Sequence, residues 1–490
     1  MTGTSDFHQF NSEAMNKEQA RLVDRLYKEM MSGNLGIFAG AGFSQGAGYV
    51  NWKELLRPIA DDLNLDIDSE TDLVAIAQYH FTQQGDNRSR LNQQLVEAFS
   101  KRSVPTENHR ILARLPISTY WTTNYDRLIE NALEDANKIV DAKYAVSQLP
   151  ITRYKRDAVV YKMHGDVEHP NDAILTRYDY ERYHLVMAPF IDALKGDLVS
   201  KTLLFMGFSF TDPNLDYILS RVRIAFEQNR RKSECIIRRL SREDGESEAK
   251  FEYRQRKQGY FEAELTRYGL TVTHVDDYSE ITVILRALEA RYRHQSIFIS
   301  GAAHDYAPYD KEEAERFVFS LSKQLSLKEK RIISGFGLGV GSAVVAGVIE
   351  ATSTSGKALD DDRLVVRPFP QSEPGAMSRQ QAWSKYRDDI LSRAGIAIFL
   401  FGNKLEDGDL VLSDGMREEF NLALKHGVFP LPVGATGYVS RDLWEEVIAR
   451  IRSGELQVSP EVDALIHELG DETKSLDELM VLVLKLVSLI

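Results

Sequence analysis

Residues 35–44 have the sequence LGIFAGAGFS, an apolar run that becomes a glycine turn at Gly40-Ala41-Gly42 and ends at the polar Ser44. Such a run predicts a buried strand followed by a tight turn whose backbone N–H groups can approach a phosphate closely. The spacing departs from the dinucleotide fingerprint G-x-G-x-x-G, because the third glycine, Gly46, comes one residue late. By itself, the stretch fits either a nucleotide site or a glycine turn without a ligand.

Length and composition restrict the class of protein. The 490 residues indicate at least two domains, and the net charge of −13 disfavours a nucleic-acid-binding surface. Cys235 is the single cysteine, which excludes an internal disulfide or a cysteine-rich zinc module and favours the reducing cytoplasm. The first residues lack a signal-peptide pattern, and no apolar run approaches the roughly 18 residues of a membrane span. We therefore expect no membrane segment.

The pattern of apolar residues predicts an α/β fold for the first 290 residues or so. A helix over residues 17–31 precedes the opening strand, and a helical insertion is expected over residues 52–115. Strand-like runs then alternate with helices, which is typical of a mainly parallel sheet covered on both faces. These runs are residues 118–121, 159–163, 203–206, 235–237 and 270–275.

The same pattern starts again near residue 290, after a helix expected over residues 280–292. A strand over residues 295–301 ends at Gly301, and a second strand leads into the loop Gly335-Phe-Gly337-Leu-Gly339-Val-Gly341. Further strands are expected over residues 396–401 and 428–433. We therefore predict two domains, residues 1–290 and 291–490, each a Rossmann-type α/β layer structure.

Four polar segments of the first domain follow predicted strands. They are Gly40–Ser44, TTNYD at residues 122–126, KMHGD at residues 162–166 and GFSF at residues 207–210. In an open parallel sheet, ligands bind beyond the carboxyl ends of the strands, so all four segments belong at one edge. Taken singly, Asn124, His164 and Ser209 each fit a turn or cap role. Their common position favours one site.

These four segments resemble the sirtuin-type NAD-binding domain. The resemblance implies that Asn124 and His164 are catalytic, with Asp126 beside the nicotinamide ribose and ring. It implies that the pyrophosphate and the far side of the dinucleotide are held by Gly40, Ala41, Gly42, Ser44, Gly207 and Ser209. Protein-deacetylating sirtuins also carry a four-cysteine zinc module and a Gly-Ile-Pro-Asp-Phe-Arg stretch, but this chain has one cysteine and QGAGYVNW at residues 45–52. We therefore expect no zinc and disfavour deacylation.

The remaining chemistry is cleavage of the bond between nicotinamide and ribose. The leaving group is neutral, so no general acid is required, and the site must position one nucleophile and exclude bulk water. Asn124 is suited to orient a water or the ribose hydroxyls, and His164 can accept a proton from either.

The second domain has its own candidate anion site. Glycine backbone before an apolar helix suits a phosphate, which makes Gly301, Gly335, Gly337 and Gly339 candidates. Arg367, Lys385 and Arg387 could supply cationic side chains, although charged residues on a helix are usually just solvated. We favour Arg367, because prolines fix the chain around it.

Residues 291–490 resemble the SLOG nucleotide-sensing domain, and the whole chain resembles the ThsA-like effectors of the Thoeris anti-phage systems. The resemblance implies a bacterial, homotetrameric NAD+ hydrolase that is activated when its SLOG domain binds a cyclic ADP-ribose isomer made by a TIR-domain partner enzyme. It does not identify the isomer. Two alternatives remain open: a sensor that binds NAD or ADP-ribose without cleaving it, and a sirtuin-type deacylase or ADP-ribosyltransferase.

Overall fold

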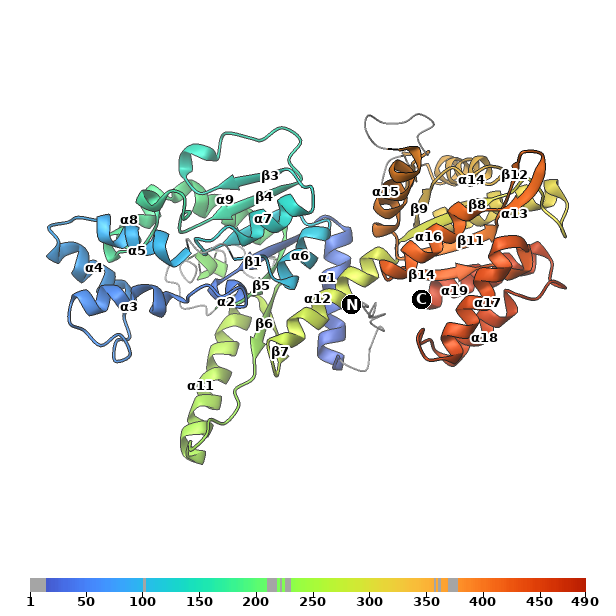
Figure 1. Cartoon of the computed structure of the whole chain (residues 1–490). Coiled ribbons are helices and arrows are strands. Elements are labelled where there is room, and N and C mark those ends of the chain that lie inside the picture. Colours follow the sequence, from blue (N-terminus) through green and yellow to red (C-terminus); the bar gives the residue numbers. More distant parts are fainter. Residues whose placement is uncertain are drawn as a thin grey trace. The chain divides into compact units, whose positions relative to one another are not determined.

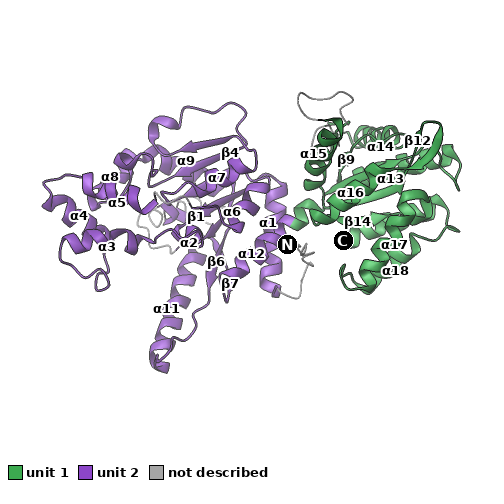
Figure 2. Ribbon diagram, viewed as in Figure 1, with its two compact units in different colours: residues 1–11, 290–490 green, residues 12–289 purple. Residues whose placement is uncertain are grey.

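A computed structural model describes residues 15–99, 103–208, 218–220, 223–224, 231–356, 358–359, 363–368 and 378–490. The chain divides into two compact units, of which one ends at Glu289 and the other continues from Ala290 to Ile490 (Figure 2). We call them the N-terminal unit and the C-terminal unit. Among the described residues, no helix has the length and apolar character needed to cross a bilayer.

The N-terminal unit is built on a seven-stranded sheet in which every neighbouring pair is parallel, in the order β3-β4-β2-β1-β5-β6-β7 (Figure 1). The strands are β1 (Leu35–Ala39), β2 (Thr119–Thr122), β3 (Val140–Lys143), β4 (Ala158–Lys162), β5 (Thr202–Met206), β6 (Ser233–Arg238) and β7 (Leu270–Val275). The five strands predicted after β1 are confirmed to within two residues at either end. The sequence did not indicate β3, because this edge strand carries the charged Asp141 and Lys143 among its four residues.

Helices cover this sheet and form the predicted insertion between β1 and β2. They are α1 (Lys17–Met31), α2 (Ala41–Gln45), α3 (Trp52–Asp62), α4 (Leu73–Gln83), α5 (Ser89–Phe99), α6 (Glu107–Arg114), α7 (Leu128–Asp135), α8 (Arg177–Val186), α9 (Ala188–Ser200), α11 (Glu248–Arg267) and α12 (Ser279–Arg293). Figure 1 shows α3, α4, α5 and α8 grouped at one end of the unit. The insertion has its own apolar core, which includes Tyr125 from the loop after β2.

The register of the sheet aligns the carboxyl ends of its four central strands. Ala39 lies opposite Thr122 and Met206, and Thr122 lies opposite Lys162. These four residues end β1, β5, β2 and β4, so the four loops that follow all begin at one level of the same edge. The polar segments predicted to form a site therefore share one edge of the sheet.

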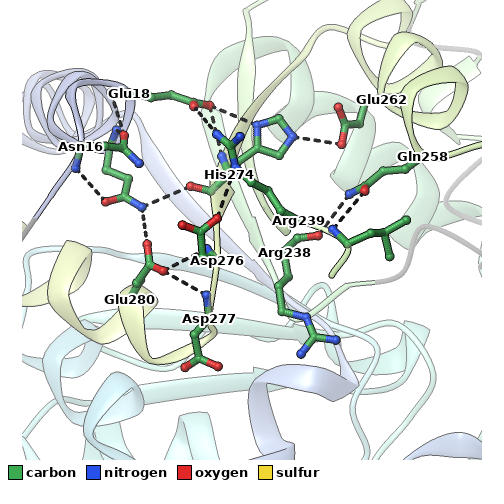
Figure 3. A network of polar contacts seen from close by, with 12 residues as sticks. Asn16, Glu18, Arg238, Arg239, Gln258, Glu262, His274, Asp276, Asp277 and Glu280 are labelled. Carbon is green, nitrogen blue, oxygen red and sulfur yellow. Dashed lines mark hydrogen bonds and ion pairs between the residues drawn. The ribbon is translucent and has the colours of Figure 1, made fainter. Parts of the chain in front are cut away.

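A polar network connects the start of α12 to α1, β7 and α11 (Figure 3). The Gln19 side chain on α1 donates hydrogen bonds to the Glu280 carboxylate at 2.5 Å and to the carbonyl of His274 at 3.2 Å. The His274 ring lies between two carboxylates, with Nε2 3.0 Å from Glu262 and Nδ1 3.5 Å from Glu18. These contacts hold α1, β7, α11 and the start of α12 together.

The C-terminal unit contains a second parallel sheet in the order β10-β9-β8-β11-β14 and a separate antiparallel hairpin. The sheet strands are β8 (Ser296–Ala302), β9 (Arg331–Ser334), β10 (Leu364–Val366), β11 (Ile396–Phe401) and β14 (Phe429–Pro432), and the hairpin is formed by β12 (Asn403–Glu406) and β13 (Asp409–Leu412). The helices are α13 (Lys311–Leu327), α14 (Gly341–Thr354), α15 (Arg379–Ser392), α16 (Asp414–Lys425), α17 (Tyr438–Arg452), α18 (Pro460–Glu468) and α19 (Leu476–Leu489). Two Rossmann-type α/β units, as predicted from the sequence, are thus present.

Gly207, which directly follows β5, is a test of how tightly the strand ends pack. Its φ is +64°, and a Cβ there would lie 2.1 Å from the backbone nitrogen of Phe43. We expect Gly207→Ala to lower the free energy of unfolding by about 2–4 kcal/mol, from the left-handed backbone and the overlap together. Denaturant unfolding followed by circular dichroism measures this.

Gly196→Ala is the matched control, because Gly196 lies inside α9 and a Cβ there meets nothing within 4 Å. Alanine should raise stability at that position by about 0.5–1 kcal/mol. Equal midpoints for Gly207→Ala and the wild type would contradict the close packing.

Candidate functional site

Asn124 connects the loop after β2 to the loop after β1 by hydrogen bonds. Its side-chain Nδ2 donates hydrogen bonds to the Gly40 carbonyl at 3.0 Å and to Ser44 Oγ at 2.9 Å. Its backbone N–H donates to Thr122 Oγ1 at 2.9 Å, and that hydroxyl donates in turn to the Ala39 carbonyl at 2.9 Å. The side chain of Asn124 is therefore held in one orientation by the glycine turn.

The other atom of this amide is the most informative one in the site. Asn124 Oδ1 is buried and has no hydrogen-bond partner among the described residues. The two acceptors that face Nδ2 fix which end of the amide is the oxygen. Because a buried acceptor without a donor costs free energy, it points to a ligand hydroxyl or a water as its partner.

Asp126, like Asn124, contacts the Ser44 hydroxyl. Its Oδ1 accepts a hydrogen bond from the backbone of Leu128 at 3.0 Å, and its carboxyl group also interacts with the Ser44 hydroxyl. Burial raises the pKa of Asp126 above its ordinary value, although Lys162 and these hydrogen bonds act in the opposite direction. Ser44 thus joins the two polar residues of the loop after β2.

His164 follows β4 and is buried among aromatic rings. The centroid of its ring lies 5.7 Å from that of Tyr180, and 6.4 Å from those of Tyr125 and Tyr183. Gly165, next in the chain, has a φ of +92° and would place a Cβ 2.9 Å from Ala173 Cα. The turn after His164 is therefore tightly packed, and the rings of three tyrosines lie around the imidazole.

The glycine turn after β1 is bonded to the end of β5. Gly40 donates its N–H to the Met206 carbonyl and Gly42 donates to the Gly207 carbonyl, both at 2.9 Å. Ala41 and Gly42 are exposed at the start of α2, whereas Ser44 is buried. The structure thus brings six predicted residues into contact, and His164 comes from the loop beside them. The six are Gly40, Gly42, Ser44, Asn124, Asp126 and Gly207. Ser209 lies outside the described residues.

In the C-terminal unit, the predicted glycines allow close approach of two loops. Gly301 lies inside β8, one residue before its end, and a Cβ on Gly337 would sit 2.0 Å from the Gly301 carbonyl oxygen. Gly339 has a φ of +76° and would place a Cβ 2.0 Å from the Ala303 oxygen. Gly335 is buried directly after β9. The loop between β9 and α14 therefore lies on the end of β8.

The predicted cations of this unit differ in position. Arg367 is exposed, but its backbone N–H donates to the Ser334 carbonyl at 2.9 Å, so it lies beside the start of the glycine loop. Lys385 is exposed on α15. Arg367 is thus placed next to the predicted Gly335 by its bond to Ser334.

Arg387, which the sequence pattern ranked below Arg367, is buried and paired. It contacts Glu418 at 2.6 Å and Glu419 at 3.4 Å, and Glu419 accepts a hydrogen bond from Ser300 Oγ at 2.6 Å. Burial raises the pKa of Glu419, against the effect of Ser300 and Arg387. Arg387, Glu419 and Ser300 thus form a buried polar cluster near the end of β8. The burial of Arg387 could have been predicted from the sequence, because Arg387 shares a helical face with Ile390 and Leu391, which are both buried.

Comparison with known proteins agrees with both units. Residues 118–261 match the SIR2-like domain family, and residues 280–490 match the Sir2- and TIR-associating SLOG family. The chain is similar to the NAD(+) hydrolase ThsA of Bacillus cereus strain MSX-D12, with 49% identity over 94% of this chain and 96% of the relative. It is 45% identical to the protein of that name from Acinetobacter baumannii strain 532279, over 93% and 95% of the two chains. A relative of the same name from Cytobacillus dafuensis is 42% identical over 97% of each.

Thr122 tests how strongly its hydrogen bonds between the ends of β1 and β2 stabilise the fold. Thr122→Val removes the hydroxyl that serves both the Ala39 carbonyl and the Asn124 N–H in a buried place, at nearly constant volume. We expect a loss of about 1–3 kcal/mol in the free energy of unfolding, measured by urea titration. Thr266 is exposed on α11, and its hydroxyl bonds the Glu262 carbonyl of the same helix, so Thr266→Val should stay within about 0.5 kcal/mol of the wild type. Similar losses in the two variants would contradict the prediction.

Proposed function

This chain belongs to the ThsA family of NAD(+) hydrolases, and we propose that it cleaves the nicotinamide–ribose bond of NAD+ to give ADP-ribose and nicotinamide. The observation that carries the proposal is the buried Asn124 Oδ1, an oriented acceptor that lacks a donor among the described residues. A ribose hydroxyl or the attacking water supplies that donor.

The reaction needs few groups from the protein. The bond between ribose C1′ and nicotinamide N1 breaks with its electron pair on N1, so the positively charged ring leaves as neutral nicotinamide. A water oxygen bonds to C1′ and releases one proton, which balances the hydrolysis. The site must hold the water and the oxocarbenium-like ribose in line and keep bulk water out.

The residues around the strand ends fit these tasks. We assign Asn124 the orientation of the water or the ribose hydroxyls, and His164 the acceptance of the released proton. The tyrosines around His164 limit the access of bulk water to it. We assign Asp126 to the nicotinamide ribose and ring. We assign the dinucleotide phosphates to the exposed Ala41, where Gly40, Gly42 and Gly207 lack side chains that would block their approach. Ser44 holds the Asn124 amide.

We propose further that the C-terminal unit binds a cyclic ADP-ribose isomer, made by a TIR-domain partner enzyme, and thereby activates the hydrolase. The match to a family described as associating with Sir2 and TIR proteins supports this, as do the glycine loop after β9 and the buried Arg387 and Glu419 near the end of β8. Arg367, Lys385 and the glycines at 301, 335, 337 and 339 are the assigned contacts. The active form in this proposal is a bacterial homotetramer that depletes NAD+ on phage infection.

Asn124→Ala and His164→Ala test the hydrolytic site. Loss of an oriented acceptor should lower kcat for NAD+ cleavage by about 10²–10³-fold, and loss of the base by about 10²–10⁴-fold. Mass spectrometry of NAD+ incubated with the protein, alone and with cyclic ADP-ribose isomers, measures free ADP-ribose and nicotinamide.

Asn131→Ala and His184→Ala are matched controls, because both residues are exposed on α7 and α8. They should keep wild-type rates, and circular dichroism confirms that every variant is folded at the assay temperature. Full activity in Asn124→Ala or His164→Ala would overturn its assigned role. NAD+ left intact under all conditions would favour a binding protein, and ADP-ribosylated protein would favour a transferase.

Arg367→Ala tests the activator site. The isomer concentration for half-maximal activation should rise about tenfold or more, equivalent to about 1.4 kcal/mol of binding free energy, while the KM for NAD+ stays unchanged. A titration of nicotinamide release against each isomer gives both values. Arg452→Ala, at the exposed end of α17, should respond as the wild type does. An identical response of Arg367→Ala would remove Arg367 from the pocket.

A further inference from the structure

Lys162, the last residue of β4, is a charged side chain with no exposure at all. Its ammonium group donates to the backbone carbonyl of Tyr125 at 3.1 Å and to that of Asp126. It also contacts the carboxylates of Asp166 at 2.5 Å and of Glu130 at 3.1 Å. One side chain therefore joins three segments: the loop after β2, the loop after β4 and helix α7.

These segments carry the proposed chemistry. Tyr125 and Asp126 directly follow Asn124, and Asp166 lies two residues after His164. The three N–H bonds of an ammonium group match the two carbonyls and the Asp166 carboxylate in number. Three further contacts join the same two loops. The Val167 N–H donates to the Tyr125 carbonyl at 3.0 Å, the Tyr125 hydroxyl donates to the Ile174 carbonyl at 2.6 Å, and Arg127 pairs with Glu168 at 2.6 Å near the surface.

The charges in this cluster keep the lysine ionised. Burial acts to lower the pKa of Lys162, but the carboxylates of Glu130, Asp166 and Asp126 outweigh it and hold that pKa above the ordinary value. A buried ion cluster is costly to desolvate, and apolar residues often serve stability as well or better. Stability alone is therefore a weak reason for an ammonium group at this position.

We propose that Lys162 is a positioning residue for NAD+ cleavage, which locks the loop that carries Asn124 to the loop that carries His164. The inference rests on the proposed function. The water or ribose hydroxyl held by Asn124 and the base at His164 must keep one separation, and a misplacement of about 1 Å can cost about 10²-fold in rate. Lys162 holds that separation through its bonds to the Tyr125 and Asp126 carbonyls and to Asp166, without contact to the substrate.

Lys162→Met and Lys143→Met form the decisive pair. Lys143 is also a buried lysine at the end of a strand, but it pairs with Asp141 at 2.7 Å and bonds Ile151, away from both site loops. Both variants should lose thermal stability. At a temperature where both are folded, Lys162→Met should lower kcat about 10²-fold with KM for NAD+ within about threefold of the wild type, and Lys143→Met should keep its kcat. An equal kcat in the two variants would overturn the proposal.

Hydrogen exchange separates this inference from the proposed function. Amides of residues 123–128 and 164–168 should exchange faster in Lys162→Met than in the wild type, and at the wild-type rate in Lys143→Met. If wild-type protein with cyclic ADP-ribose isomers releases no nicotinamide, the proposed function fails. The exchange rates then still decide whether Lys162 couples the two loops, and unchanged exchange in Lys162→Met refutes that coupling.

Asp166→Ala decides the question if Lys162→Met does not fold. This change cuts the bond from Lys162 to the loop after β4 and leaves the two carbonyl bonds of Lys162 in place. It also removes the bond that Asp166 Oδ1 accepts from the Glu168 N–H, so the exchange of residue 168 is not used as a readout. We expect kcat to fall about tenfold, since one of the bonds that fix the separation is lost, with little change in KM and faster exchange of residues 164–167 alone. A wild-type kcat in a folded Asp166→Ala variant overturns the proposal.

Discussion

The hydrogen-bond register of the N-terminal sheet is the constraint on which the site depends. Because Ala39, Thr122, Lys162 and Met206 end their strands in one row, four loops far apart in sequence start at the same level. Side-chain hydrogen bonds can then connect loop to loop, as Thr122 and Asn124 do between β2 and β1. A slip of one residue in any pair would turn every side chain of the shifted strand to the other face and disconnect the site.

Bringing these loops together buries polar side chains at the sheet edge, which costs free energy. The apolar core of the helical insertion packs around Tyr125, which lies between Asn124 and Asp126 in sequence. In that environment, burial raises the pKa values of Asp126 and Glu130, and the Lys162 ammonium group partly offsets the effect. Burial also strengthens the electrostatic interactions among these side chains.

Local sequence patterns predicted the strands well, because their buried apolar runs are bounded by glycine and polar residues. β7 and β11 have the predicted bounds, whereas β3 escaped notice because it lies at the sheet edge with a buried Asp141–Lys143 pair. Asn124 and His164 could be named as site candidates because they follow strands. The bonds of Lys162 to the Tyr125 and Asp126 carbonyls could not be predicted, since they depend on strand order and register rather than on neighbours in sequence.

The two units share one architecture, and two asparagines show how their strand ends differ. Asn403 follows β11 as Asn124 follows β2, and both are buried. The Asn403 oxygen accepts from the backbone of His304 and Asp305, and its nitrogen donates to the Asp305 carbonyl, so it is satisfied by the protein itself. Asn124 leaves its oxygen for a donor from outside the described residues. An amide satisfied by its own chain fixes the shape of a binding loop, whereas an oriented amide with a vacant acceptor can act on a reacting group. This contrast supports catalysis in the N-terminal unit and recognition in the C-terminal one.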